Sequence, residues 1–496
     1  SFTNPIIYQD LPDNDVFYGP DGYFYLSASN FHFSPGAPIY RSQDLQNWEA
    51  VGHSIPTLDF GDNYSLIGSQ AYRRGTWASS MRYRKSNKTW YWIGCIDFWN
   101  SFIYTAPSPS GPWTRSASLW ERCYYDCGLF IDDDDTMYVV HGSNNVNVTQ
   151  LAPSGLSEVK TTVMASNPPG FDGMEGNRMY KRNGVYYILN DSGSAQITWI
   201  WRSDSPTGPW TSKVLQQYSG GPLGGGGTPH QGSLVQTPLG DWYFVSFTWD
   251  FPLGRVPVIA PVTWGSDGWP VLGLVSGKWN QTYPNPLEQV PTAPWTGTDT
   301  FTGTALSPRW EWNHNPDTTK FTVLGNGGVT LSAATVTDDL YRARNTLTHR
   351  LQGGAPVATI QLDTSNLGDG DRAGLACFRD LTAYIGVARK GSSYSVVVRH
   401  NMTLSSADWT TTSIGADVAS APVPRGRIWL RGLADALGNS TKQVRFSYSL
   451  DGRTFSPLSG AYPLNTDWAL FMGYRWGIFN LATKALGGSV KLISFT

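Results

Sequence analysis

The chain has 496 residues, and 36 Lys or Arg against 38 Asp or Glu give a formal net charge of −2. This balance provides no positive surface for nucleic acid or anionic lipid, and no apolar run approaches the roughly 18 residues of a membrane span. The 53 Gly and 32 Pro indicate many turns and few long helices. The 22 Trp, 25 Tyr and 21 Phe, combined with little charge, favour an all-β protein with surfaces suited to stacking on sugar rings.

A short phrase recurs five times in the first 250 residues: one or two turn residues, followed by an aromatic strand that contains Tyr. The copies are Asp21–Tyr25, Asn87–Tyr91, Asp134–Tyr138, Asn183–Tyr187 and Gly240–Tyr243. Their final tyrosines are 47 to 66 residues apart. A loose period of this size, with a hairpin signal in each copy, is typical of propeller blades. The repeats predict a five-bladed β-propeller over residues 1–283, with an ordinary β-sandwich as the alternative.

A set of functional side chains occurs 12 to 14 residues before these tyrosines, on the strand that precedes each hairpin. The set is Asp13, Trp77, Asp126, Glu175 and His230. In a propeller the first strand of each blade lines the central channel. We therefore expect three carboxyls, an indole and an imidazole to meet near the axis.

Two carboxyls that face one pocket are the minimum equipment for hydrolysing a glycosidic bond. Glu175 is the candidate acid, because the apolar neighbours Phe171 and Met174 disfavour its charge. Asp13 is the candidate base, with Asp15 as its alternative, and Asp126 would raise the pKa of the acid. A sugar-binding lectin propeller is the rival class. Lectin propellers usually repeat one site in each blade, whereas these five positions differ.

Several stretches resemble the motifs of glycoside hydrolase family 43, the five-bladed propeller enzymes that act on arabinose- and xylose-containing polymers. They are Asn4-Pro5 with Pro12-Asp13, Ser34–Ile39 with Ser42–Trp48, Tyr125-Asp126 before Leu129-Phe130, Glu175-Gly176 before Met179–Lys181, and His230–Ser233 with Gly254-Arg255 and Asp267–Pro270. The resemblance covers most of residues 1–275. It implies inverting hydrolysis with Asp13 as general base, Glu175 as general acid and Asp126 as the residue that tunes and orients the acid.

The same resemblance guides the remaining site expectations. We expect Arg255, Trp77, His230 and Phe33 to bind substrate, and His230 to lie near the axis, where some relatives hold calcium. No cofactor is expected for the chemistry; a structural calcium ion is the one metal considered. The chain departs from the family's xylosidases beside the base, where Asn14-Asp15 replaces the usual Pro-Ser or Pro-Asp, and after Gly176, where Asn177 replaces a common proline.

A second domain is predicted after a proline-rich linker at residues 284–298, which is extended and semi-rigid. Alternating strands such as 357–362 and 393–398 predict a β-sandwich over residues 299–496. The stretches Trp310–Pro316, Asn345–Arg350 and Gly370–Leu375 resemble the lectin-like sandwich of two-domain family members. That resemblance implies that the sandwich packs on the propeller and contributes a loop to the pocket wall; an independent carbohydrate-binding module is the rival view.

The compartment is expected to be extracellular. Ser1 has no initiator Met before it, so we expect that a signal peptide has been removed. Glycosylation sequons lie at Asn63, Asn87, Asn147, Asn190, Asn280, Asn401 and Asn439. The cysteines at 95, 123, 127 and 377 allow three full pairings, and neither a CxxC pair nor an HExxH motif suggests zinc.

The sequence as a whole predicts a secreted, monomeric, inverting exo-α-L-arabinofuranosidase. Its expected substrates are plant cell-wall arabinoxylan and the derived oligosaccharides, including xylose units that carry two arabinoses. The altered base segment and the two-domain layout resemble fungal arabinofuranosidases most. Exo-β-xylosidase activity on xylo-oligosaccharides is the close alternative, since arabinofuranose and xylopyranose present similar atoms at the reacting carbon.

Overall fold

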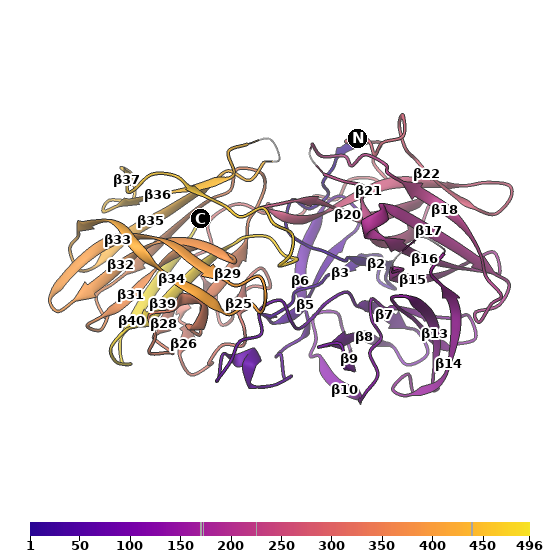
Figure 1. Cartoon of the computed structure of the whole chain (residues 1–496), viewed down its shortest axis with the longest axis horizontal. Coiled ribbons are helices and arrows are strands. Elements are labelled where there is room, and N and C mark those ends of the chain that lie inside the picture. The colour runs from indigo at the N-terminus through magenta and orange to yellow at the C-terminus, as the bar shows by residue number, and fades with distance from the viewer. Residues whose placement is uncertain (169–170, 172, 225, 438–439) are drawn as a thin grey trace.

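The computed structural model describes residues 1–168, 171, 173–224, 226–437 and 440–496. The chain forms two β-rich halves that lie side by side, with the N-terminal half in indigo to magenta and the C-terminal half in orange to yellow (Figure 1). Helix within the described ranges is confined to three short 3-10 turns: η1 (Asp62–Ser65), η2 (Gly193–Ala195) and η3 (Leu340–Arg342). No helix in these ranges is both long enough and apolar enough to cross a bilayer. The sequon at Asn439 lies outside the described residues.

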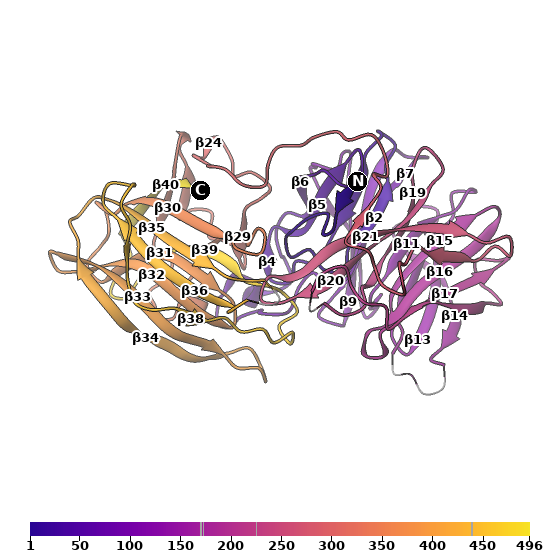
Figure 2. The same cartoon turned by 90° about the horizontal axis from the view of Figure 1, so that it is seen from above.

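The N-terminal half is a propeller of five four-stranded antiparallel sheets, which confirms the prediction from the repeats (Figures 1 and 2). The first blade contains β2 (Asp15–Tyr18), β3 (Phe24–Ser27), β5 (Gly36–Ser42) and β6 (Trp48–Ile55). The second contains β7 (Ser80–Arg84), β8 (Thr89–Ile96), β9 (Asn100–Ala106) and β10 (Thr114–Leu119). The third contains β11 (Gly128–Ile131), β12 (Met137–Gly142), β13 (Asn145–Leu151) and β14 (Glu158–Ser166). The fourth contains β15 (Glu175–Arg182), β16 (Val185–Ser192), β17 (Ile197–Ser203) and β18 (Thr211–Gln217), and the fifth contains β19 (His230–Gln236), β20 (Trp242–Asp250), β21 (Gly254–Trp264) and β22 (Pro270–Leu272).

Asp15 is the hub that ties the innermost strands together. Its carboxylate is fully buried and accepts hydrogen bonds from Ser80 Oγ at 2.6 Å, Arg82 Nη1 at 2.7 Å and Ser233 Oγ at 3.1 Å. Arg178 Nε lies 3.2 Å from Asp15 Oδ1. Burial alone would raise the pKa of Asp15, but the two guanidinium groups lower it. Asp15 therefore joins blades one, two, four and five.

The ring of blades is closed by the two ends of the propeller sequence. Strand β1 (Phe2–Thr3) pairs antiparallel with β23 (Thr282–Tyr283). The amide of Asn4 makes two 3.0 Å hydrogen bonds with the backbone of Ile259 on β21. This closure holds the first blade against the fifth.

The C-terminal half is a concanavalin A-like β-sandwich, as predicted. One sheet has the order β34 (Thr411–Pro422), β33 (Ser393–Leu404), β32 (Leu381–Lys390), β31 (Asp371–Phe378), β39 (Arg475–Ala482), β29 (Leu347–Arg350), β25 (Glu311–Asn313) and β4 (Phe33–Ser34). The other has β26 (Phe321–Val323), β28 (Val329–Ser332), β40 (Ser489–Phe495), β30 (Val357–Asp363), β35 (Arg427–Ala434), β36 (Gln443–Ser449) and β37 (Ser456–Pro457), with β38 (Tyr462–Pro463) beside β36 and a small pair formed by β24 (Thr302–Gly303) and β27 (Gly325–Asn326). Alternate residues Ala358, Ile360 and Leu362 of β30 are fully buried, because successive side chains of a strand point to opposite faces.

The two halves share a strand and a buried cluster of charges. Strand β4 leaves the first blade and pairs with β25, so it forms the edge of a sandwich sheet. Beside it, the buried carboxylate of Glu311 contacts Arg350 at 2.7 Å, Arg475 at 2.6 Å and His53 at 2.5 Å. The halves are therefore joined by backbone pairing and by paired buried charge.

The segment at residues 284–298 contains neither helix nor strand and runs along the first blade. The backbone N–H of Val290 donates to Asp44 at 2.8 Å, and Thr292 Oγ1 donates to the carbonyl of Trp48 at 3.2 Å. The ring of Trp295 lies 5.7 Å from that of Tyr40. This connection is therefore attached to the propeller along its length.

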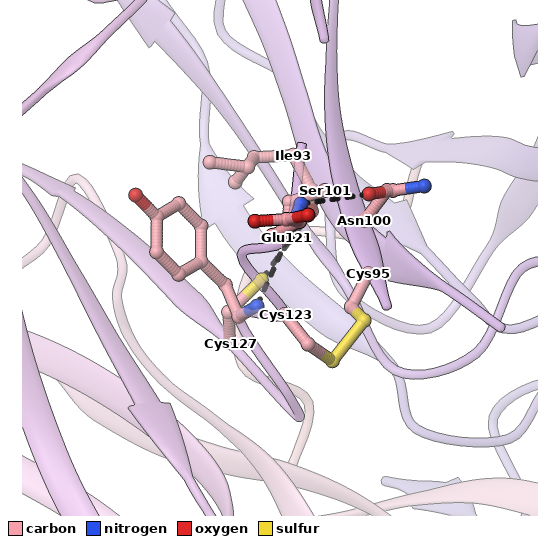
Figure 3. The surroundings of a disulfide bond; sticks show 8 residues. Ile93, Cys95, Asn100, Ser101, Glu121, Cys123 and Cys127 are labelled. Carbon is pink, nitrogen blue, oxygen red and sulfur yellow. Dashed lines mark hydrogen bonds between the residues drawn. A yellow bond between two sulfur atoms is a disulfide. The ribbon is translucent and has the colours of Figure 1, made fainter. Parts of the chain in front are cut away.

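One disulfide joins Cys95 and Cys123, while Cys127 and Cys377 are buried free thiols. It connects the end of β8 to the loop that enters the third blade (Figure 3). Among the sequons, Asn190 is buried and accepts a hydrogen bond from Trp201 Nε1 at 3.0 Å, so it is unsuited to carry a glycan.

Candidate active site

The five sequence-predicted axial residues converge at one pocket of about 420 Å³. Asp13, Trp77, Asp126, Glu175 and His230 all line it, each at or just before the first strand of its blade. The rest of the lining comes from Phe31, Ala78, Tyr125, Gly193, Ser194, Gln231, Trp249, Arg255, Trp468 and Phe471. The volume lies in the range of small-molecule sites.

Irregular backbone turns these side chains toward the axis. Asp13, Asp126 and Gln231 have φ values of 57°, 45° and 57°, in the left-handed region that residues other than Gly rarely adopt. The pairing of β15 with β16 shifts register after Glu175, and that of β19 with β20 shifts after His230. Such bulges are frequent beside active sites, because they re-aim a side chain that a regular strand would point elsewhere.

Asp13 is held by one arginine and one hydroxyl. Arg255 Nη1 donates to Asp13 Oδ1 at 2.9 Å, Nη2 reaches Oδ2 at 3.4 Å, and Ser29 Oγ donates to Oδ2 at 2.7 Å. A two-pronged guanidinium contact fixes orientation as well as charge. The carboxylate of Asp13 is therefore fixed in place while it lines the pocket.

Glu175 and Asp126 sit close together on neighbouring blades. Tyr125 OH donates to Glu175 Oε2 at 3.1 Å. Asp126 Oδ2 accepts the backbone N–H of Gly176 at 3.0 Å and Gln231 Nε2 at 3.3 Å. Burial, together with the charge of Asp13, raises the pKa of Glu175. Burial and the charges of Glu175 and Asp13 raise the pKa of Asp126.

Asp191 is a fourth carboxyl in this cluster, which the sequence analysis missed. It lies on β16 directly across from Glu175 and is 1% exposed, and among the described residues neither of its carboxylate oxygens has a hydrogen-bond partner. Burial and the charges of Glu175, Asp126 and Asp13 raise its pKa. A side chain at Gly176 would stand 2.3 Å from Asp191 Oδ1, so only Gly fits between Asp126 and Asp191. The available signal was an acidic residue two positions after the apolar run at residues 185–189.

The sandwich supplies one wall of the pocket. Trp468 and Phe471 line it from the loop before β39. The carbonyl of Phe471 accepts a hydrogen bond from Arg255 Nε at 3.0 Å, and Phe471 lies 5.4 Å from the ring of Trp77. This arrangement agrees with the wall-forming expectation rather than with an independent module.

Asp10 fastens that wall to the propeller. Its Oδ1 accepts the backbone N–H of Arg255 and its Oδ2 that of Gly473, both at 2.8 Å. The contact is close: a side chain at Gly473 would lie 1.7 Å from the carbonyl oxygen of Leu253. Asp10 is 3% exposed, so both hydrogen bonds are shielded from water.

His230 and Trp77 lie in the pocket as expected. His230 Nδ1 faces the carbonyl of Thr228 at 3.0 Å, and burial lowers the pKa of the imidazole, which favours its neutral form. Trp77 Nε1 donates to the carbonyl of Arg73 at 2.8 Å, which leaves the indole faces for ring contacts. Both side chains are fixed by their polar atoms.

Calcium prefers six to eight oxygen ligands. Over the described ranges, no group of three or more His, Cys, Asp or Glu side chains is arranged to hold a metal. The described residues around His230 therefore provide no cluster of such side chains for calcium, and we derive no step through a metal.

Phe33 and Asp15 are placed differently from the expectations. Phe33 is 3% exposed on β4, where the guanidinium of Arg475 lies 3.5 Å from its ring centre, so it faces the interface between the halves. Phe31, two residues earlier, lines the pocket instead. Asp15, the alternative base, is buried, and its carboxylate forms ion pairs with Arg82 and Arg178.

A smaller cavity of about 130 Å³ adjoins the main pocket. The two share Trp77, Ala78, Tyr125 and Asp126, and the smaller one extends to Arg74, Cys95, Asp97 and Phe98. Its lining is mainly apolar apart from Asp97 and the shared Asp126, whereas Asp13 and Glu175 line only the main pocket. The site therefore consists of the main pocket and a smaller side pocket that share one wall.

Several carboxyls at one pocket, one of them paired with Arg and others with raised pKa, provide both members of an acid–base pair. Residues 2–270 match the model of glycosyl hydrolases family 43. The chain belongs to this family. Residues 298–495 match the β-xylosidase C-terminal concanavalin A-like domain. Both matches confirm the resemblance found in the sequence, and family 43 enzymes need no cofactor for their chemistry.

Relatives within family 43 carry more than one activity in their names. A β-xylosidase of Formosa agariphila is 25% identical, covering 100% of this chain and 90% of the relative. A non-reducing end α-L-arabinofuranosidase of Bacteroides ovatus is 30% identical over 64% of this chain and 62% of the relative. A solved structure is 41% identical with a TM-score of 0.96, covering 100% of this chain and 99% of the other. It belongs to an engineered family 43 glycoside hydrolase that displays both endo-xylanase and exo-arabinofuranosidase activity.

Proposed function

We propose that this glycoside hydrolase is an inverting, exo-acting α-L-arabinofuranosidase that removes arabinose side chains from arabinoxylan, including those on xylose units that carry two. The observation that carries the proposal is that the side pocket adjoins the main pocket and shares Trp77 and Tyr125 with it. A chain-end xylose needs one pocket. A doubly branched xylose places one arabinose at the carboxyls and needs space beside it for the second.

In the proposed reaction, Asp13 accepts a proton from water as the water oxygen attacks the anomeric carbon of arabinose. Glu175 donates its proton to the leaving oxygen as the glycosidic bond breaks. Arg255 and Ser29 keep Asp13 oriented, and the raised pKa of Glu175 favours the protonated carboxyl that the reaction requires. Each side chain thus has a role that its contacts support.

Asp126 is proposed to modulate the acid. It is anchored by Gly176 and Gln231, so its carboxyl stays beside Glu175. Like charges resist joint ionisation in a buried site. Arg255, Trp77 and His230 are proposed to contact the sugar, and Phe33 is replaced in this role by Phe31.

The alternative is an exo-β-xylosidase, and the names of several relatives favour it. The Formosa agariphila relative carries that name, and a relative from Escherichia coli that is 26% identical is a putative β-xylosidase. The solved structure with exo-arabinofuranosidase activity is more similar, at 41% identity over the full chain. This greater likeness supports our choice of arabinose.

The test offers the enzyme three substrates: doubly and singly substituted xylo-oligosaccharides and linear xylobiose, with proton NMR following the released sugar. We expect arabinose from a branched substrate, first seen as the inverted β-anomer. Xylose from xylobiose without release of arabinose would reverse the assignment. Arabinose first seen with retained configuration would refute the role of Asp13 as the base for water.

We also propose that the enzyme acts outside the cell, on plant cell-wall polymer, and as a monomer. The disulfide between Cys95 and Cys123 supports an oxidising compartment.

A further inference from the structure

Three large aromatic side chains stand exposed on the second blade beside the pocket. Phe98, Trp99 and Trp120 are 59%, 62% and 64% exposed. We call these three residues the aromatic platform. Large apolar side chains that gather on a surface commonly mark a binding site.

The platform is presented by a strained turn. Asp97 and Phe98 join β8 to β9 with φ values of 58° and 59°, and the N–H of Trp99 donates to the carbonyl of Ile96 at 3.2 Å. A bulky residue such as Phe rarely adopts this left-handed conformation. Tyr64 OH holds the turn by donating to Asp97 Oδ1 at 2.5 Å. Strain of this kind persists only where neighbouring contacts hold it, and it is frequent at ligand sites.

A second loop carries Trp120 and is fixed to the first. The N–H of Glu121 donates to Asn100 Oδ1 at 2.8 Å, and Cys123 is bonded to Cys95 (Figure 3). Trp99 and Trp120 directly precede the two residues of that hydrogen bond. The disulfide and the hydrogen bond therefore hold the two exposed indoles on adjoining loops.

The platform meets the pocket at Phe98. Phe98 lines the side pocket and lies 4.7 Å from the ring of Trp77. It also stacks on Tyr125 at 6.0 Å with an interplanar angle of 22°. A ligand held at the carboxyls would therefore meet aromatic surface as it extends past Phe98.

The chemistry of these loops suits a neutral sugar polymer. Asp97, Glu121 and Arg122 place charges of both signs near the indoles. Such a mixture does not select a strongly charged polymer, whereas indole rings bury large apolar area against a ligand. Xylopyranose units present apolar C–H faces and carry no charge.

We propose that the aromatic platform binds the β-1,4-linked xylose main chain at a distance from the bond that is cleaved. The inference rests on the proposed function, because it identifies the polymer that carries the arabinose branches. Binding along the main chain would hold the polymer while one branch enters the pocket.

The test compares W99A, W120A and the double variant with Y18A. Tyr18 is 41% exposed at the end of β2 that is remote from Asp13, so Y18A removes an exposed aromatic from the other end of that strand. Electrophoresis through gels containing linear β-1,4-xylan, arabinoxylan or arabinan measures binding without requiring turnover. Hydrolysis of a small aryl arabinofuranoside is measured in parallel.

We expect both linear xylan and arabinoxylan to retard the wild-type enzyme, and each polymer to retard Y18A as much as the wild-type enzyme. The double variant should bind both polymers about tenfold more weakly, which corresponds to about 1.4 kcal/mol of binding free energy. Its turnover of the aryl substrate should match that of the wild-type enzyme.

Equal retardation of the double variant and the wild-type enzyme would contradict the proposal that the aromatic platform binds xylan. Retardation by arabinan alone would overturn the choice of main chain. Size-exclusion chromatography that finds a wild-type dimer and a monomeric double variant would assign the surface to a second copy of the chain. If the wild-type enzyme binds linear xylan through these indoles but releases only xylose from oligosaccharides, the platform stands and the proposed arabinofuranosidase fails.

Discussion

The carboxylate of Asp10, near the start of the propeller, accepts a hydrogen bond from the backbone N–H of Gly473, in the sandwich, at 2.8 Å. Its other oxygen accepts the N–H of Arg255, whose guanidinium holds Asp13. One buried side chain thus fixes the position of the arginine at the proposed base and of the loop that carries Phe471. The pocket depends on contacts between the two halves of the chain.

Replacing Asp10 with Ala should impair both catalysis and stability. Two buried N–H groups lose their acceptor, at a cost of about 1–3 kcal/mol each. Displacement of Arg255 and Phe471 should lower kcat/KM on a small aryl glycoside about 100-fold, because small misplacements disrupt the reactive geometry. D44A is the matched control: Asp44 is fully buried and accepts the backbone N–H groups of Gln46 and Asn47 away from the pocket. Equal activity of D10A and D44A would contradict the role of Asp10.

Replacing Tyr125 with Phe should move the alkaline limb of the pH–activity profile to higher pH. The hydroxyl of Tyr125 donates to Glu175 and favours the ionised carboxylate, so it lowers a pKa that burial raises. Without it, the pKa of Glu175 rises further and the acid keeps its proton to higher pH. Kinetics of kcat/KM against pH measure the shift. Y124F serves as the control, because Tyr124 OH donates to Glu158 rather than to a carboxyl of the pocket. An unshifted limb in Y125F would count against Glu175 as the proposed acid.

Replacing Glu311 with Gln should weaken the contact between the halves. Burial alone would raise the pKa of Glu311, but Arg350, Arg475 and His53 lower it far below its usual value. Its stabilising effect is therefore complete above the unfolded pKa of about 4.3 and declines as the pH falls toward the folded pKa. At pH 7, E311Q leaves two buried guanidiniums without a counter-charge, a loss of about 3–5 kcal/mol.

Thermal unfolding of wild type and E311Q across pH measures that loss. The difference between their midpoints should be large at pH 7 and shrink below about pH 4. E49Q is the control, because the pair of Glu49 with Arg41 is partly exposed and worth about 0–1 kcal/mol. A pH-independent difference for E311Q would show that lost packing, rather than charge, causes its instability.

Removing the disulfide should loosen the second blade. Cys95 and Cys123 are 28 residues apart, and a closed loop of that length stabilises a fold by about 3–4 kcal/mol. Reductant should therefore lower the denaturant midpoint of the wild-type enzyme but leave that of C95S/C123S unchanged. Identical midpoints for oxidised wild type and the double variant would mean that the disulfide does not contribute to stability.

Repeat spacing was sufficient to place Asp13, Asp126 and Glu175 at one pocket. Each residue lies at or just before the first strand of its blade. Because the first strands of all blades surround the propeller axis, residues at this position come close together. The prediction was wrong for Phe33 because the chain leaves the first blade between β3 and β5 to pair with β25. Phe31 precedes that departure and remains in the pocket.

Repeat spacing could not locate residues that reach the pocket through cross-strand or long-range contacts. Asp191 reaches the cluster from the second strand of its blade, directly across from Glu175. Trp468 and Phe471 come from a loop more than 200 residues after Arg255, and no local pattern marks them. The pairing of Cys95 with Cys123 likewise depended on which loops adjoin in space.

Strand β4 has a consequence for swapping parts among related enzymes. The edge of the sandwich sheet is encoded at residues 33–34, far upstream of the rest of that sheet. A chimera cut only at the proline-rich connection would therefore pair a foreign sheet with a mismatched border strand. A chimera should therefore carry the segment around β4 from the same parent as the C-terminal half, so that the sandwich sheet keeps its own edge strand.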